Sequence, residues 1–229
     1  MCIRDRVGTA ALGVPADILN LANWKLTLPI GTQRVGRPDE ILQPQLARFA
    51  IAPYFVVNPT KTGVVFNAPV GGVTTSNSGY PRSELREMSG GTEASWSNTT
   101  GVHTMTVTEA ITHLPVVKPH VVAAQVHDAE DDVVMVRLEG SKLFVEQNGD
   151  SIGTLDAAYR LGTVFTVKLE ASGGHVKVFY NGVLKVDSLR SGSGWYFKAG
   201  AYTQSNPTKG DAPDAYGEVV IYALDVTHA

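Results

Sequence analysis

The sequence has almost no cysteine, no long apolar run and no large excess of charge of either sign. Its single cysteine, Cys2, excludes a disulfide within the chain. No stretch reaches the ~20 continuous apolar residues that a membrane helix needs, so we predict no membrane partner. The formal net charge of −3 gives no overall basic field, which argues against nucleic acid as a partner. An anionic ligand would need a local basic patch.

The two ends of the domain can be estimated from composition. Residues 1–6 read like a translated cloning adapter, and no signal-peptide pattern follows them. We therefore interpret residues 1–14 as a poorly ordered leader or artefact. No repeat, low-complexity linker or change of composition divides the rest of the chain, so residues 15–229 are predicted to form one domain, with a monomer as the default state.

Strand patterns dominate the remainder. Helical patterns are confined to residues 15–21 and 38–49, and both are too short to be stable alone. Two Asn-Gly pairs, at residues 148–149 and 181–182, predict type I′ hairpin turns. Short β-branched runs occupy residues 102–107, 133–138, 142–146, 164–170 and 176–180. Strands at this spacing without intervening helices indicate an antiparallel sandwich or barrel, an all-β fold.

Three segments carry unusual polar faces, because residues two apart on a strand point the same way. In the first, Arg82, Glu84 and Arg86 share a face, and the carboxylate can hold both guanidiniums rigid for an anionic ligand. A solvated ion-pair ladder is the alternative. In the second, Gln125 and His127 project away from an apolar face.

The third segment has an alternating pattern. One face consists of Phe197, Ala199 and Ala201, and the other carries Tyr196, Lys198, Gly200, Tyr202 and Gln204. Gly200 in the middle of the polar face is expected to leave room for a ligand to approach the backbone. Half-buried packing tyrosines are the alternative interpretation.

Together these blocks resemble a known family. Residues 82–86 (RSELR), 125–127 (QVH) and 196–204 (YFKAGAYTQ) are similar, in order, to the three signature blocks of the family 7 alginate lyases, and residues 23–29 resemble that family's N-terminal strand. The similarity spans roughly residues 15–226. It implies a jelly roll of two curved antiparallel sheets, concanavalin A-like with few short helices. It also implies a substrate groove on the concave sheet that carries the three blocks.

The implied activity is depolymerisation of alginate by β-elimination. Removing the C5 proton of a uronate requires the adjacent carboxylate to be neutralised, and Arg82 and Gln125 match the family residues for this role. His127 is expected to act as a neutral base and Tyr202 as the acid, because a tyrosine holds its proton at neutral pH. Tyr202 can instead be the base if nearby cations favour its ionised form.

The remaining site residues are assigned to substrate binding or to orienting the catalytic groups: Glu84, Arg86, Lys198, Tyr196 and Gln204. This set supplies the local basic patch, so no metal or cofactor is required. Val126, where many relatives carry Ile, favours polymannuronate. The function implies secretion, although no signal is visible. The acidic residues 128–132 are interpreted as a solvated loop that bends away from the substrate.

Other functions remain open. A glycoside hydrolase would need paired catalytic carboxylates, and the Glu-x-Asp-x-x-Glu pattern of jelly-roll hydrolases is absent. A non-catalytic carbohydrate-binding module need not keep Gln125, His127 and Tyr202 together. A lyase for another polyuronate, such as glucuronan, could use the same residues. How open the groove is depends on the segments 31–39, 71–80 and 204–216.

Overall fold

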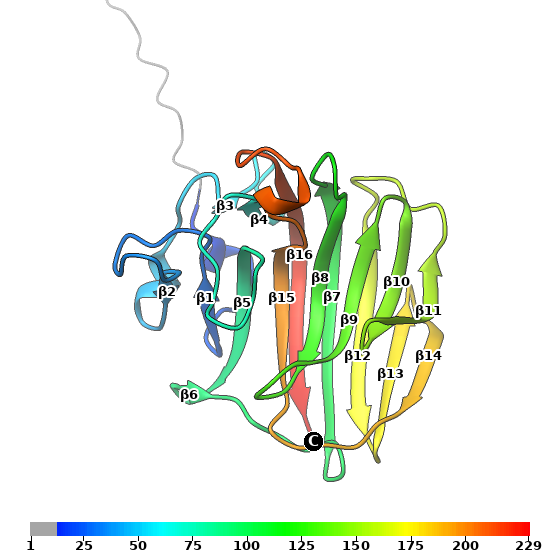
Figure 1. Ribbon diagram of the computed structural model, residues 1–229. Helices are drawn as coiled ribbons and strands as arrows, with labels where there is room; N and C mark the ends of the chain where they lie inside the picture. The colour runs from blue at the N-terminus through cyan, green and yellow to red at the C-terminus, as the bar shows by residue number, and fades with distance from the viewer. Residues whose placement is uncertain (1–12) are drawn as a thin grey trace, which may run out of the picture.

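Two antiparallel β-sheets stack face to face in the computed structural model, which describes residues 13–229 (Figure 1). Cys2 and residues 1–12 of the expected leader lie outside the described residues. The strands are β1 (Trp24–Thr27), β2 (Glu40–Ile41), β3 (Phe55–Val57), β4 (Val64–Pro69), β5 (Arg82–Ser89), β6 (Thr92–Glu93), β7 (Val102–His113), β8 (His120–His127), β9 (Asp132–Glu139), β10 (Lys142–Gln147), β11 (Asp150–Asp156), β12 (Phe165–Ser172), β13 (His175–Tyr180), β14 (Val183–Leu189), β15 (Tyr196–Thr203) and β16 (Tyr216–His228).

One sheet has nine strands in the order β11-β10-β9-β8-β15-β5-β1-β2, with β6 pairing β5, and we call it the site-bearing sheet. The other has seven strands in the order β14-β13-β12-β7-β16-β4-β3. Neighbours within each sheet are often distant in the sequence. The architecture confirms the predicted all-β sandwich of two antiparallel sheets.

Helix is confined to short 3-10 turns in the described residues: η1 (Pro15–Asp17), η2 (Gln45–Arg48) and η3 (Pro207–Lys209). The helix expected over residues 38–49 is therefore wrong in its first part, where β2 forms instead. Glu40 and Ile41 pair with Thr27 and Leu26 of β1, so sheet pairing overrides the local helical pattern. No helix of the described part combines the length and apolarity needed to cross a bilayer.

Both Asn-Gly turns form as predicted. Asn148 and Gly149 have φ values of 53° and 84°, and Asn181 and Gly182 have φ values of 47° and 81°. Positive φ at both central residues defines the type I′ turn, whose twist matches that of the flanking strands. The turns join β10 to β11 and β13 to β14, and fix the register of both hairpins.

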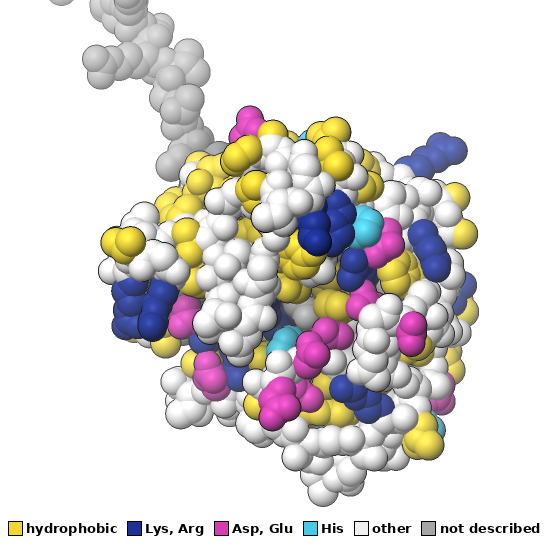
Figure 2. Space-filling model, viewed as in Figure 1, with side chains coloured by type: hydrophobic (Ala, Val, Ile, Leu, Met, Phe, Trp, Pro, Cys, Tyr) yellow, Lys and Arg dark blue, Asp and Glu magenta, His cyan; other side chains and the backbone are white. Residues whose placement is uncertain are grey.

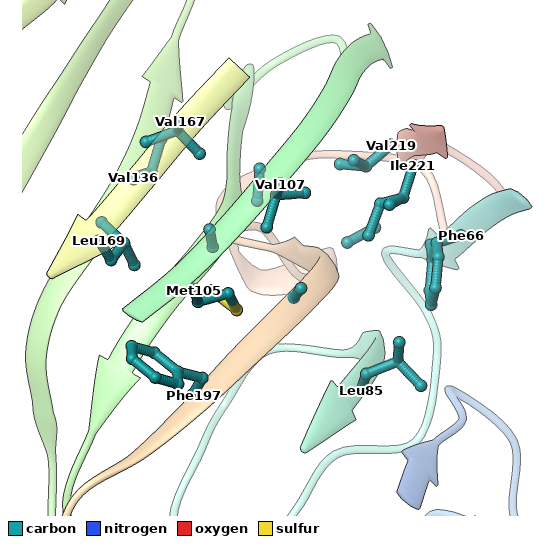
Figure 3. Packing of buried hydrophobic residues seen from close by; sticks show 14 of the residues in the cluster. Phe66, Leu85, Met105, Val107, Val136, Val167, Leu169, Phe197, Val219 and Ile221 are labelled. Carbon is teal, nitrogen blue, oxygen red and sulfur yellow. The ribbon is translucent and has the colours of Figure 1, made fainter. Parts of the chain in front are cut away.

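The core lies between the sheets, where the inward-facing residues of each strand meet. Figure 3 shows Val167 and Leu169 of β12 and Met105 of β7 lying across from Phe197 of β15. All four are 0% exposed. Each such side chain stabilises the fold by about 1.5–3 kcal/mol relative to exposure, so the sheets are held as a rigid support for the outward-facing residues.

A carboxylic acid is buried among the apolar residues of the core. Glu109 of β7 is 0% exposed, and neither carboxyl oxygen has a hydrogen-bond partner within the described residues. Burial raises the pKa of this carboxyl to about 8, because the charged form is poorly solvated in an apolar interior.

Candidate active site

The three polar segments form adjacent strands at the centre of the site-bearing sheet. β15 lies between β8 and β5, with Lys198 opposite Gln125 on one side and Arg86 on the other. Above these strands is a cleft of about 520 Å³. Figure 2 shows the hollow at the centre of this face, with acidic, basic and histidine side chains around it. The predicted residues that line it are Arg82, Arg86, Gln125, His127, Tyr196, Lys198 and Tyr202.

Glu84 lies beneath the cleft and not on its wall. Its carboxylate is 1% exposed and binds Lys198 Nζ at 2.6 Å, Arg82 Nη1 at 3.0 Å and the Gln125 amide. Burial alone would raise the pKa of Glu84, but Lys198 and Arg82 hold it below its ordinary value. Glu84 therefore fixes the orientation of three cleft donors, which fits the orienting alternative of its predicted role and not a direct contact with substrate.

Lys198 is the counterpart of this carboxylate. Burial lowers the pKa of Lys198 to about 8, while Glu84 opposes the shift. The ammonium group is therefore mainly charged at neutral pH. It supplies positive charge at the floor of the cleft between β8 and β5.

His127 is held in a defined tautomer. Its Nδ1 lies 2.6 Å from the carbonyl oxygen of Asp128, and a carbonyl oxygen only accepts, so Nδ1 carries the proton. In the neutral ring Nε2 then bears the lone pair. Burial first, and then the charge of Lys198, lower the pKa of His127. The ring is therefore neutral at neutral pH, with Nε2 able to accept a proton.

Tyr202 contacts two groups at the other side of the cleft. The guanidinium carbon of Arg82 lies 3.8 Å from its ring centroid, a cation–π geometry. Its hydroxyl is 2.8 Å from the Ser78 hydroxyl. Ser78 lies in the segment between β4 and β5, and no sequence pattern had marked it as a functional residue.

Arg86 departs from the expected pairing with Glu84. Its guanidinium carbon lies 3.8 Å above the ring of Tyr196, and its Nη2 is 3.3 Å from Glu93 of β6. Tyr196 stacks on His127, with its hydroxyl 3.0 Å from Nδ1. Arg86 thus orients Tyr196 against the histidine, and Glu84 holds only Arg82 of the two arginines.

Gln204 is separated from the other predicted residues. It follows the end of β15, is 6% exposed and does not line the cleft. Its backbone N–H donates to His120 O at 3.0 Å. The chain therefore turns toward β8 at this point, and the alternation of side chains along β15 does not continue to Gln204. The expected contact of Gln204 with substrate is therefore not supported by its position.

Gly200 also has a different role from the expected one. Its φ is +141°, and an added Cβ would lie 2.5 Å from Ser83 O and 2.8 Å from the Cα of Glu84. Residues 200–201 form a bulge against β8. The glycine is therefore required by close approach of β15 to β5, not by a ligand.

The acidic segment lines the cleft instead of bending away from it. Residues 129–132 all contribute to the wall beside His127. The segment is compact, because Asp128 Oδ1 accepts the backbone N–H of Glu130 and of Asp131. Burial, followed by repulsion from Asp131, raises the pKa of Asp132 to about 6, so the wall is negatively charged at neutral pH.

Comparisons with known proteins agree with this arrangement. The family model for alginate lyase matches residues 19–228. A solved alginate lyase of polysaccharide lyase family 7 is 56% identical, with a TM-score of 0.91, covering 94% of this chain and 99% of that one. An alginate lyase from a Corynebacterium species is 51% identical, with a TM-score of 0.91, covering 96% and 100%. A Klebsiella pneumoniae alginate lyase is 36% identical over 90 residues, which are 38% of this chain and 29% of that protein.

The jelly-roll fold and the cleft on its site-bearing sheet define the class as the polysaccharide lyases. Within that class, the chain belongs to the alginate lyase family. The predicted resemblance to this family is confirmed.

Proposed function

We propose that the protein depolymerises alginate by β-elimination at the 4-O-glycosidic bond and leaves a C4–C5 unsaturated uronate at the new non-reducing end. One observation carries this proposal. A neutral histidine and a tyrosine hydroxyl line the same cleft, above a buried carboxylate that orients Arg82, Gln125 and Lys198. The similar solved proteins are named alginate lyases, which supports alginate as the substrate.

The donors on the cleft floor neutralise the uronate carboxylate next to C5. Arg82 and Gln125 carry this role, with Lys198 adding positive charge between them. Loss of a proton from C5 places a second negative charge on the uronate, so preorganised donors lower the barrier, typically by a factor of ~10²–10³ per group. Because Glu84 already holds these donors, little reorganisation accompanies the reaction.

Proton transfer is assigned to His127 and Tyr202. In guluronate the C5 proton and the O4 leaving group lie on opposite faces, so His127 Nε2 takes the proton and the Tyr202 hydroxyl protonates O4. In mannuronate they lie on the same face, and Tyr202 performs both transfers: its phenolate takes the C5 proton, and the resulting hydroxyl then protonates O4. Positioned acids and bases each contribute ~10²–10⁴ in rate.

Polymannuronate is the proposed preferred block. This preference rests on Val126, which lies between Gln125 and His127 in the sequence of β8 and is 0% exposed, with its side chain in the core. Its effect is indirect, through the height of those two side chains above the sheet.

We further propose that the protein acts as a secreted monomer. A polymeric uronate lies outside the cell, and one chain carries every residue assigned to the reaction.

The test is ultraviolet absorbance of the conjugated C4–C5 double bond during separate incubation with polymannuronate, polyguluronate and glucuronan. A rise with alginate blocks, faster on polymannuronate, is the expected result. A rise only with glucuronan would retain the chemistry and change the substrate. Binding without any rise, by a folded protein, would overturn the enzymatic proposal in favour of a binding module.

A further inference from the structure

A second groove adjoins the candidate active site. It has a volume of about 670 Å³ and lies between the segment joining β1 to β2 and the segment joining β4 to β5. It shares lining residues with the cleft: Glu40, Thr75, Ser76 and Ser78. The two depressions are therefore neighbouring parts of one surface, and a polymer seated in the cleft can extend into the second groove.

Two arginines line this second groove. Arg34 and Arg37 are both exposed, and neither has an ion pair or side-chain hydrogen bond with another described residue. Their segment is nevertheless well fixed. Buried Asp39 accepts the backbone N–H of Gln33 at 2.8 Å and of Thr32 at 3.0 Å, and Arg37 N–H donates to Arg34 O at 3.1 Å.

The cations of the cleft itself are in a different state, because each has a carboxylate partner. Lys25 binds Glu40 at 2.7 Å, and Arg86 lies 3.3 Å from Glu93. Arg82 and Lys198 share Glu84 in the same way. Among the cations that line these two depressions, Arg34 and Arg37 are thus the ones that form no ion pair with a described carboxylate.

The charge along the surface is therefore asymmetric. The segment joining β8 to β9 and the first residue of β9 place Glu130, Asp131 and Asp132 at one side of the cleft. The arginine segment joins β1 to β2, on the opposite side of β15 and β5 in the strand order. A polyanion is repelled at the first side and attracted at the second.

We propose that Arg34 and Arg37 form a distal carboxylate-binding site for the polyuronate chain, several sugars from the reacting one. The site rests on the proposed lyase function and adds a direction to it. The polymer extends from the reacting sugar toward the arginines, and few sugars are held on the acidic side. Substrates too short to reach the second groove gain nothing from it.

The experiment compares polymeric substrate with the shortest oligosaccharide that the wild-type protein cleaves. In the double variant Arg34→Gln and Arg37→Gln, KM for the polymer should rise about three- to tenfold, since exposed ion pairs are individually weak. The kcat for the polymer and the kcat/KM for the short oligosaccharide should not change. Added salt should raise the polymer KM less in the variant than in the wild type.

The matched control removes the same charge elsewhere. Arg48 and Arg160 are also exposed but line neither depression, so the double variant Arg48→Gln and Arg160→Gln should keep the wild-type polymer KM. Equal rises in both double variants, or an equal loss on polymer and short oligosaccharide, would overturn the distal site. If the wild-type protein releases no unsaturated product, it is the lyase proposal that fails, and the outcomes are distinct.

Discussion

Glu109 offers the sharpest test of the energetics of this fold, through the substitution Glu109→Gln. In the folded protein burial raises the pKa of Glu109 to about 8, from an ordinary value of 4.5. In the unfolded chain the carboxyl ionises at its ordinary value. The folded state therefore keeps its full stability below about pH 4.5 and loses it progressively as the pH rises to about 8.

The magnitude follows from the size of the shift. Each pH unit between the two pKa values costs about 1.4 kcal/mol, so the wild type loses about 3 kcal/mol between pH 4.5 and pH 7. A glutamine has nearly the same shape and no charge to remove from water. The free energy of unfolding of Glu109→Gln should therefore exceed that of the wild type by about 3 kcal/mol more at pH 7 than at pH 4.5.

The assay is urea denaturation of both proteins at several pH values between 4.5 and 8. The difference between the two proteins isolates Glu109, because all other ionisable groups are common to both. A difference in the free energy of unfolding that is the same at every pH would reflect only the cost of burying the glutamine amide. Glu170→Gln, on the outward face of the adjacent β12, serves as control. Parallel wild-type and Glu109→Gln curves across this range would refute the reasoning.

Four further substitutions test the site and the strand that carries it. His127→Ala and Tyr202→Phe should each nearly abolish turnover while leaving the thermal unfolding midpoint close to wild type; near-normal rates on the preferred substrate would remove them from catalysis. Ser78→Ala removes the hydrogen bond to Tyr202 and should lower kcat up to about tenfold with little change in KM, since such a bond is worth ~0.5–1.5 kcal/mol; an unchanged kcat would mean that Ser78 does not position the tyrosine. Gly200→Ala places a methyl group against β5 and should cost at least ~1–3 kcal/mol in urea denaturation, whereas Gly79→Ala, with no contact closer than 3.6 Å, should cost much less.

Local patterns in the sequence predicted the strands and turns well. Alternation and β-branching mark β12 and β13, and the Asn-Gly pairs set the turns after β10 and β13, because these features depend on neighbouring residues. The side chains that face the cleft from β8 and β5 followed from the same alternation. That β5 and β8 both belong to one sheet with β15 came from the family resemblance, since β5 and β15 are more than a hundred residues apart.

The differences arise where contacts between distant segments decide the structure. Glu84 is buried because Lys198 of β15 and Gln125 of β8 cover it. Arg86 turns to Glu93 because β6 folds back beside β5. Ser78 reaches Tyr202 only through the path of a long connection, and no local pattern encodes such a path.

The single carboxylate beneath the cleft has a consequence for how this protein can vary. Because Glu84 holds Arg82, Gln125 and Lys198 together, a substitution at any one of the four changes the surroundings of the other three. Such residues show strong epistasis: effects at contacting positions do not add. Variation that alters which polymer is bound, and how much of it, is expected to accumulate instead in the connecting segments around the cleft. The reaction and the choice of substrate can thus diverge independently in descendants of this chain.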